Sequence, residues 1–379
     1  GASNQVSRMA DRGSIRDSFK AITIIGVGLI GGSLGLAIKQ RFPTARICGV
    51  DRTTVLRAAR KKGAIDAGET SIARAVQSAD LIILATPLAV IQKLLPRVAK
   101  HCSPQSVVTD VGSVKLSIVR PATRHFPHGN FIGGHPMAGA ELTGIEAAHP
   151  LLFENAAYVL TPTKANPAAI VRRFAAFLER LGARVVLLDP KMHDEIASAV
   201  SHLPQLTAVA LMNVVGGRRA GSRRHLQLAA GGFRDLTRIA SSRPDIWKDI
   251  LSLNRKEIQR SVQLLIRELE LYLQYLQKNS SPELISRFRR ARQIRNRIPK
   301  TMKGFLHPLA EVYVFLKDQP GMLARMTAAL AQANINIKDL ELMKVREGSS
   351  GTFRLAFESR EVAVQALKVL RRKGFEIGR

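Results

Sequence analysis

The distribution of apolar positions changes character twice along the chain. Up to about residue 189, short β-branched runs alternate with stretches of helical periodicity, and glycine, proline or aspartate bounds many of them. This alternation predicts an α/β domain with a Rossmann-type, doubly wound parallel sheet over residues 20–189. We expect its strands at Ala21–Ile25, Arg46–Val50, Ala79–Ala85, Ser106–Asp110, Phe131–Gly134, Ala157–Thr161 and Arg184–Leu188, with a helix over Pro167–Leu181.

Strand signals disappear between residues 190 and 300, and helical periods replace them. A wide stripe of leucines runs through the longest helical stretch, and a helix this apolar usually packs against another helix or a second subunit. We therefore predict an all-α substrate and dimerisation domain, and a homodimer. Helices are expected over Glu195–Val215, Leu236–Ala240, Asp245–Lys278 and Pro282–Arg297.

The last region is predicted to be a separate small domain. Residues 301–310 are interpreted as a linker, and residues 311–379 alternate strand and helix patterns in the order βαββαβ, which is a ferredoxin-like split motif. At the other end, residues 1–19 are polar and charged, so we expect a disordered tail and no signal peptide. With no apolar run of membrane-spanning length, the sequence favours a cytoplasmic protein without a membrane partner.

The net charge of +29 is the most unusual feature of the composition. The excess is greatest within residues 161–310, where arginines cluster around residues 218–224 and 287–297. Clustered arginine can bind nucleic acid, but aromatic residues make up only 5% of the chain and no DNA-binding motif is present. We interpret the charge as solvated surface that steers an anionic small molecule, with no nucleic-acid partner. The two cysteines lack ligand-like spacing, which predicts no metal site and no disulfide.

A glycine-rich loop follows the first predicted strand and opens a helix. In Gly26-x-Gly28-x-x-Gly31 the first glycine permits a tight turn, the second lets a pyrophosphate approach the backbone, and the third allows close helix–strand packing. Asp51 ends the second strand, where a carboxylate accepts ribose hydroxyls and repels a 2′-phosphate. NAD is therefore the predicted cofactor. The expected cofactor contacts also include Leu29, Ile30, Arg52, Thr86 and Pro87, although Arg52 could instead accommodate the phosphate of NADP.

A histidine stands between glycines and a proline in the segment Gly134-His135-Pro136. A neutral imidazole placed there could take the proton of a hydroxyl while a nicotinamide takes the hydride from the same carbon. The structural alternative is a turn histidine that only packs. Asp110, at the end of the fourth strand, is interpreted as the cap of the following helix rather than as a catalytic acid.

Four segments together resemble the prephenate dehydrogenases of tyrosine biosynthesis. They are Gly28-Leu-Ile-Gly-Gly-Ser33, Thr109-Asp-Val-Gly-Ser113-Val-Lys115, the turn around His135 and the stretch Gly231–Trp247. A further segment, Val200-Ser-His202-Leu-Pro-Gln205, belongs to the same set. The resemblance covers nearly the whole chain from about residue 20. It implies NAD-dependent oxidation of prephenate to 4-hydroxyphenylpyruvate, CO2 and NADH. Aromatisation of the ring drives that reaction, so the enzyme mainly supplies a base, a hydride acceptor and an anion clamp.

The resemblance also implies individual roles. His135 would be the base, Ser113 would orient it, and Arg238 would grip a substrate carboxylate, although Arg238 could also pair with Asp235. Further substrate contacts are expected from His202, Gln205, Ser242, Trp247 and Lys115. Ser242 and Trp247 would line the pocket of their own subunit or that of the partner. Two alternatives stay open: Trp247 as interface packing, and Lys115 as a solvated lysine.

Gln205 stands where many members of this family carry a second histidine. Because its amide is neutral and no acidic residue is evident there, the sequence favours prephenate over its aminated analogue arogenate. An arogenate or dual-substrate dehydrogenase is the alternative enzyme. A non-catalytic sensor of NAD and an amino acid is the alternative of another class, against which the set of Ser113, His135 and Arg238 argues.

The C-terminal region resembles the amino-acid-binding ACT domain, through Asp318-Gln-Pro-Gly321-Met322 and Asn334-Ile-Asn336-Ile337. Its Pro-Gly turn would present backbone N–H groups at a helix N-terminus to an amino acid carboxylate. The resemblance implies tyrosine as a feedback effector. We expect Asp318, Gly321, Met322, Asn336 and Ile337 to form the regulatory site. The alternative is a dimerisation module without a ligand.

Overall fold

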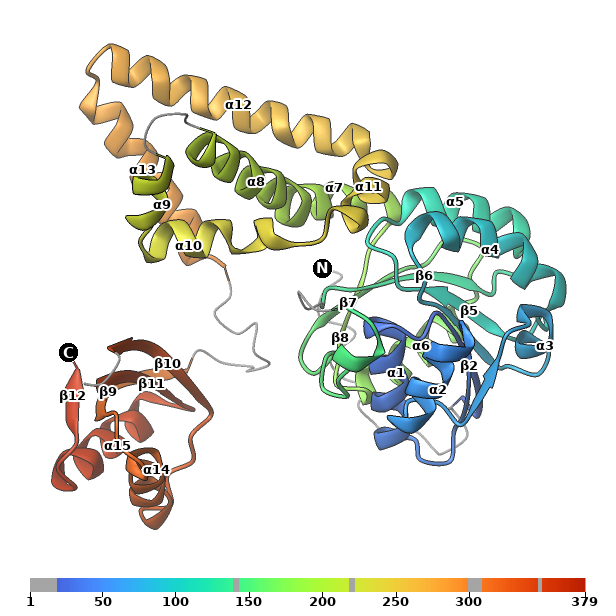
Figure 1. The fold of residues 1–379 in the computed structure, drawn as a ribbon, viewed down its shortest axis with the longest axis horizontal. Helices are drawn as coiled ribbons and strands as arrows, with labels where there is room; N and C mark the ends of the chain where they lie inside the picture. Colours follow the sequence, from blue (N-terminus) through green and yellow to red (C-terminus); the bar gives the residue numbers. More distant parts are fainter. Residues whose placement is uncertain (1–18, 139–142, 218–221, 299–308, 347–349, 379) are drawn as a thin grey trace. The chain divides into compact units, whose positions relative to one another are not determined.

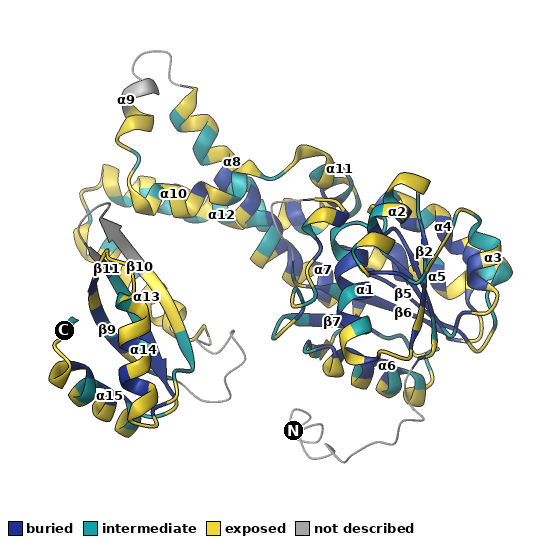
Figure 2. Ribbon diagram, turned by 60° about the horizontal axis from the view of Figure 1, so that its bottom comes forward, coloured by how far each residue is buried: buried dark blue, intermediate teal, exposed yellow. Residues whose placement is uncertain are grey.

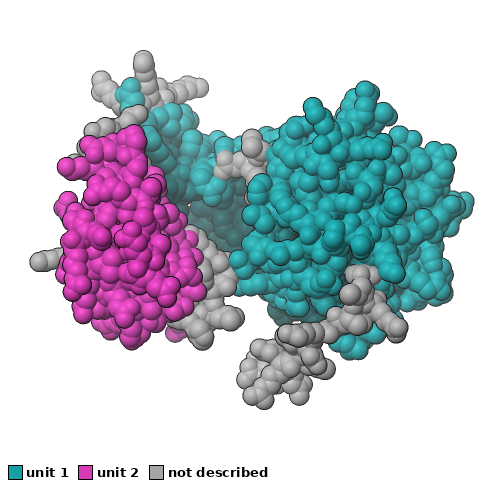
Figure 3. Space-filling view, turned by 90° about the horizontal axis from the view of Figure 1, so that it is seen from below, with its two compact units in different colours: residues 1–284 teal, residues 285–379 magenta. Residues whose placement is uncertain are grey.

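The computed structural model describes residues 19–138, 143–217, 222–298, 309–346 and 350–378. The chain divides into two compact units, residues 1–284 and 285–379, which Figure 3 distinguishes by colour. Residues 1–18 of the expected tail and residues 301–308 of the expected linker lie outside the described residues. Phe19 does not belong to a tail: it is 1% exposed and packs edge-on against Phe174 and Phe177, which corrects the predicted boundary.

The first unit contains an eight-stranded sheet with the order β3-β2-β1-β4-β5-β6-β7-β8 (Figure 1). The central strands are buried, as their β-branched sequences predict (Figure 2). Seven of the eight strands lie where the sequence places them. The strands are β1 Ala21–Ile25, β2 Arg46–Val50, β3 Ala67–Glu69, β4 Leu81–Leu84, β5 Val107–Asp110, β6 Phe131–Pro136, β7 Ala157–Thr161 and β8 Arg184–Leu187.

The sheet departs from the prediction in two respects. The short edge strand β3 was not expected, and β7 runs antiparallel to β6, although β7 and β8 are parallel to each other. The cause lies in the connection: in the described part of the segment between β6 and β7 the only helix is a three-residue 3-10 turn, Ile145–Ala147. A parallel neighbour would need a longer crossover, normally a helix.

Helices cover both faces of this sheet (Figure 1). One apolar core lies under α1, α2 and α6, and the other lies under α3, α4 and α5. Ile250 and Ile258 of the helical region complete the second core, so the two regions share a hydrophobic interface. The helices are α1 Leu29–Arg41, α2 Thr53–Lys61, α3 Ile72–Val76, α4 Leu88–His101, α5 Leu116–His125 and α6 Ala168–Arg180.

The helical region is more interrupted than the periodicity predicts. The expected helix over residues 195–215 is a run of α7 Pro190–Ala197, a π-helical turn Ser198–His202 and α8 Leu203–Gly216. The expected helix over residues 245–278 breaks at Asn254 into α11 Pro244–Leu253 and α12 Arg255–Gln277. The remaining elements are α9 Ser222–Gln227, α10 Gly231–Thr237, a 3-10 turn Arg238–Ser241 and α13 Ser281–Asn296.

Among the described residues, one helical run, Pro190–Gly216, has the length and apolar composition that would allow it to cross a membrane, and only 17% of its most apolar window is buried. The same run carries His193, Asp194 and His202, whose side chains are buried against the rest of the first unit. Much of α12 is also exposed, including Leu264, Leu269 and Leu273 (Figure 2).

The second unit confirms the predicted βαββαβ order. Its antiparallel sheet has the strand order β10-β11-β9-β12, and two helices pack on it around a core that includes Val314, Met326, Leu355 and Leu370. Asn336 and Ile337 precede the second strand, which begins at Asp339. The elements are β9 Ala310–Lys317, α14 Met322–Gln332, β10 Asp339–Arg346, β11 Ser350–Phe357, α15 Arg360–Arg372 and β12 Glu376–Gly378.

Candidate active site

The glycine-rich loop has the geometry of a phosphate cradle. Gly26 has a φ of +94°, and a Cβ on it would lie 2.6 Å from the carbonyl oxygen of Ala85. A Cβ on Gly31 would lie 2.0 Å from the oxygen of Gly26, so helix α1 approaches β1 as closely as the backbones allow. A Cβ on Gly28, by contrast, would meet nothing within 4 Å. The loop therefore has open space where the N-terminus of α1 begins.

The carboxyl ends of β2 and β4 adjoin this cradle. Both oxygens of Asp51 accept backbone N–H groups, Oδ2 from Val27 at 2.9 Å and Oδ1 from Arg52 at 2.7 Å, which ties the end of β2 to the loop after β1. After β4, the buried Oγ1 of Thr86 has no partner among the described residues, and Pro87 is the N-cap residue of α4. The open space, the helix N-terminus and the fixed carboxylate suit a dinucleotide.

His135 lies on β6, and its ring contacts a second histidine. The Nδ1 atom of His135 is 2.8 Å from Nε2 of His193, which lies on α7. Burial, followed by the neighbouring His193, Lys115 and His202, holds the pKa of His135 well below its ordinary value. The imidazole is therefore neutral at physiological pH, as a general base requires.

Asp194 completes a row of three side chains behind His135. Its Oδ1 lies 2.8 Å from Nδ1 of His193, and both residues are almost fully buried. The sequence analysis missed both. A consecutive His-Asp pair at the start of a helical region was the available signal, but nothing local to it indicates that it would face β6.

Two carboxylates of the helical region also cap helices of the α/β domain. Asp194 accepts the backbone N–H groups of Lys115 at 2.7 Å and Leu116 at 2.9 Å, at the N-terminus of α5. Asp249 accepts the N–H of Ala89 at 3.0 Å, in the first turn of α4. Each satisfies donors that the helix itself cannot pair and places a negative charge at the positive end of its dipole.

The predicted cap at Asp110 is therefore wrong, because Asp194 caps α5 from another domain. Asp110 is fully buried, and its carboxylate accepts hydrogen bonds from the ammonium of Lys115 and from the backbone N–H of Gly112. Lys115 is also fully buried and donates to the carbonyl of Gly134, directly before His135. The solvated alternative for Lys115 is thus wrong. Its contact with a substrate anion stays a prediction, with the ammonium already engaged by two acceptors.

Four of the predicted substrate residues lie together in the helical region. The hydroxyl of Ser242 accepts from the amide of Gln205 at 2.7 Å and from the indole N–H of Trp247 at 2.9 Å. His202 meets the ring of Trp247 edge-on, and its Nδ1 lies 3.3 Å from the amide nitrogen of Asn254. Burial lowers the pKa of His202 to about 4, so this ring is neutral as well.

Ser113 and Arg238, the remaining predicted residues, lie on other segments. Ser113 is half-buried in the loop between β5 and α5, and in the described part of the chain its hydroxyl makes no bond to His135. Arg238 is exposed at the start of the 3-10 turn after α10. Their predicted roles stay predictions.

The second unit has a pocket of about 400 Å³ at the turn between β9 and α14. Three of the predicted regulatory residues, Asp318, Gly321 and Met322, line it, together with Leu342 and Phe353. Gly321 has a φ of +83° at the N-terminus of α14, which explains the glycine. Asn336 and Ile337 are not among the lining residues.

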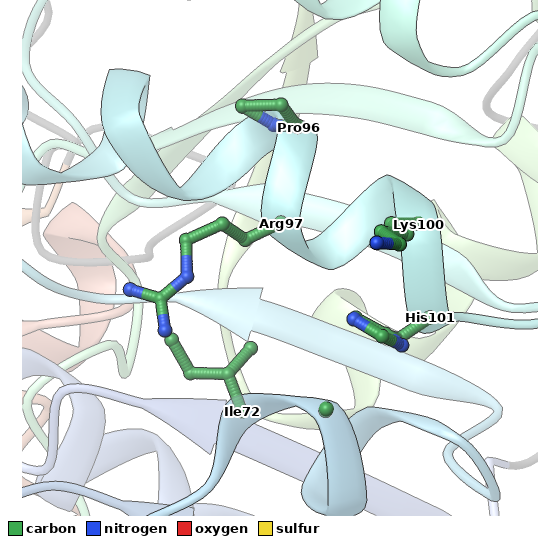
Figure 4. A pocket seen from close by; sticks show the side chains of 6 residues that line it. Ile72, Pro96, Arg97, Lys100 and His101 are labelled. Atoms are coloured by element: carbon green, nitrogen blue, oxygen red, sulfur yellow. The ribbon is translucent and has the colours of Figure 1, made fainter.

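A further hollow of about 370 Å³ lies between α3 and α4, away from all the predicted site residues (Figure 4). Arg97, Lys100 and His101 give it a basic rim beside Ile72 and Pro96. Arg97 and Lys100 are solvent-exposed, so the rim adds to the positive surface predicted from the composition.

Three family models match successive parts of the chain. Residues 34–187 match the nucleotide-binding domain of prephenate dehydrogenase, residues 189–290 match its dimerization domain, and residues 310–375 match the ACT domain.

Similar proteins span nearly the whole chain. A prephenate dehydrogenase of Bacillus subtilis is 36% identical over 89% of this chain and 92% of its own length, and one of Lactococcus lactis is 34% identical over 93% and 97%. Among solved structures, prephenate dehydrogenase from A. aeolicus in complex with hydroxyphenyl propionate and NAD+ is 29% identical, with a TM-score of 0.70 over 74% of this chain and 99% of that one. Synechocystis arogenate dehydrogenase is 31% identical, with a TM-score of 0.66 over 73% and 99%. The chain belongs to the prephenate dehydrogenase family.

Proposed function

We propose that this protein is an NAD-dependent prephenate dehydrogenase that converts prephenate to 4-hydroxyphenylpyruvate and CO2. The observation that carries the proposal is the neutral, half-buried imidazole of His135 on β6, in the same domain as a dinucleotide cradle. Family membership and the relatives' names support the substrate. Gly28 and the N-terminus of α1 would hold the pyrophosphate, and Asp51 would hold the ribose.

In the proposed reaction Nε2 of His135 takes the proton of the C4 hydroxyl. The bound nicotinamide supplies the hydride acceptor for the hydrogen on C4. The C–C bond to the ring carboxylate breaks, its electron pair completes the aromatic ring, and CO2 leaves. Arg238 would hold a substrate carboxylate by a bidentate contact, and the group around Ser242 would line the pocket.

Four further features belong to the proposal. The protein acts as a homodimer through the helical region, supported by the match to a dimerization domain and by exposed leucines on α12. Tyrosine binds the pocket around Gly321 and inhibits the enzyme, supported by the ACT match. The protein works in the cytoplasm. The basic surface steers the anionic substrate to the site.

The test is the appearance of NADH, followed by absorbance, when the purified protein is mixed with prephenate or arogenate and either NAD+ or NADP+. We expect turnover with prephenate and NAD+. Preference for arogenate would replace the substrate assignment, an alternative supported by the likeness to the Synechocystis enzyme. No turnover with either substrate would leave the sensor hypothesis.

A further inference from the structure

His193 connects the proposed base to a buried carboxylate. Its Nε2 lies 2.8 Å from Nδ1 of His135, and its Nδ1 lies 2.8 Å from Oδ1 of Asp194. His193 is 2% exposed and Asp194 is 3% exposed, so solvent does not compete for these bonds. The two rings meet nearly edge-on, at 71° with centroids 5.0 Å apart.

Asp194 determines which nitrogen of His193 carries a proton toward it. An ionised carboxylate only accepts hydrogen bonds, and Asp194 already accepts the two backbone N–H groups of Lys115 and Leu116. Nδ1 of His193 must therefore carry a proton. In a neutral His193 the other ring nitrogen, Nε2, then has only a lone pair, and it can bond to His135 only by accepting.

The hydrogen bond between the two rings also fixes which nitrogen of His135 is protonated. Because His193 accepts, Nδ1 of His135 carries the proton, and Nε2 of His135 is left with the lone pair. We infer that His193 and Asp194 are positioning residues, which hold His135 in the one tautomer whose Nε2 accepts the substrate proton. This inference rests on the proposed function. It adds that the reactive nitrogen is selected from the helical region, through α7, rather than from the strand that carries His135.

The arrangement also accounts for a second demand of the reaction. After proton transfer His135 is a cation, and its Nδ1–H still donates to His193, whose own N–H points at the charge of Asp194. The imidazolium is thus stabilised without any proton leaving His193. This is the logic by which a buried carboxylate supports a catalytic histidine in other enzymes, extended here by one imidazole.

The competing arrangement is a doubly protonated His193, which would donate from Nε2 to His135. Nδ1 of His135 would then hold the lone pair and Nε2 the proton, and His135 could not act as a base at that nitrogen. The two arrangements differ in the protonation of Nε2 of His193 and of both ring nitrogens of His135, so they can be distinguished by measurement.

The first experiment uses three variants of the full-length protein. His193→Leu removes the acceptor, and we expect kcat with prephenate to fall on the order of 10²-fold or more while KM changes little. His193→Gln places a carbonyl oxygen near the former Nε2, and we expect it to restore at least about tenfold of that loss. His128→Leu makes the same change at an exposed histidine and should retain wild-type kcat. NAD binding and thermal stability establish that each variant is folded.

Equal activity of His193→Leu and the wild type would overturn the inference, as would a glutamine variant that is folded but no better than the leucine variant. Absence of turnover in the wild type would instead contradict the proposed function. A second measurement needs no variant: ¹⁵N NMR of histidine-labelled wild-type protein. We expect protons on Nδ1 of both His135 and His193. A proton on Nε2 of His135 in the resting enzyme would overturn the inference whatever the variants do.

Discussion

The ammonium of Lys115 contacts the carboxylate of Asp110, and neither side chain has any exposed surface. Burial lowers the pKa of Lys115, and the charges of Asp110 and Asp194 oppose that shift. Such a pair contributes little net stability, because desolvation offsets the attraction, but removing one partner strands the other as an uncompensated charge.

Lys115→Met should therefore destabilise the protein by about 3–5 kcal/mol, measured by urea unfolding of the first unit's transition. The matched control is Lys39→Met, which removes a similar contact with Asp66 where both side chains are about one-third exposed. The Lys39→Met change should lower the free energy of unfolding by about 0–1 kcal/mol. An equal loss of unfolding free energy in the two variants would show that removing Lys115 does not leave Asp110 as an uncompensated buried charge.

His135→Asn should lower kcat by on the order of 10²- to 10⁴-fold while NAD+ binds as before, because a base is lost and the cradle at Gly28 is untouched. Single-turnover kinetics and a fluorescence titration with NADH measure the two quantities separately. A variant that loses both would indicate a collapsed site rather than a missing base.

The pH dependence of kcat/KM should reflect the lowered pKa of His135. The base must be unprotonated in the free enzyme, and a pKa well below the ordinary histidine value, about 6.5, keeps it so as the pH falls. We expect kcat/KM to remain on its plateau at pH 6.5 and to decline only at lower pH. A midpoint at or above 6.5 would mean that the charged ring is better stabilised than its surroundings indicate.

How far the sequence predicts this molecule depends on whether a feature is local. The glycine-rich turn between a strand and a helix, seven of the eight strands of the first unit and the βαββαβ order follow from patterns a few residues long, and they lie where the sequence predicts them. The direction of β7 was not, since parallel and antiparallel strands share one apolar pattern. The usable signal was the segment between β6 and β7, whose described part contains only a three-residue 3-10 turn.

Side-chain pairing across domains was beyond the sequence for a physical reason. Asp110 and Asp194 are both plausible caps, and only the packing of α7 against α5 decides that Asp194 serves as one. The break between α11 and α12 at Asn254 has a similar cause. The buried side-chain amide of Asn254 donates to the carbonyl of Asp194, and the apolar pattern of the helix does not indicate this contact. The contact of His193 with His135 likewise joins residues far apart in the sequence, so no local pattern predicts it.

Arg238→Gln should raise KM for prephenate by about 10- to 100-fold with a smaller effect on kcat, because a charge-assisted contact with a substrate carboxylate is lost. Arg234→Gln, an exposed arginine one turn earlier on α10, is the control and should leave KM unchanged. An unaltered KM in the Arg238 variant would remove that residue from the proposed site.

Regulation can be tested at the pocket beside Gly321. If tyrosine lies with its carboxylate at the N-terminus of α14, its ammonium group needs an acceptor, and Asp318 is the acidic residue among those that line the pocket. Asp318→Ala should raise the tyrosine concentration for half-inhibition about tenfold, the equivalent of one charge-assisted hydrogen bond. Glu376→Ala, on β12 and outside the pocket, controls for loss of charge in the same unit. A wild-type enzyme that tyrosine does not inhibit would leave the second unit with a structural role. Inhibition unchanged by Asp318→Ala would place the effector elsewhere.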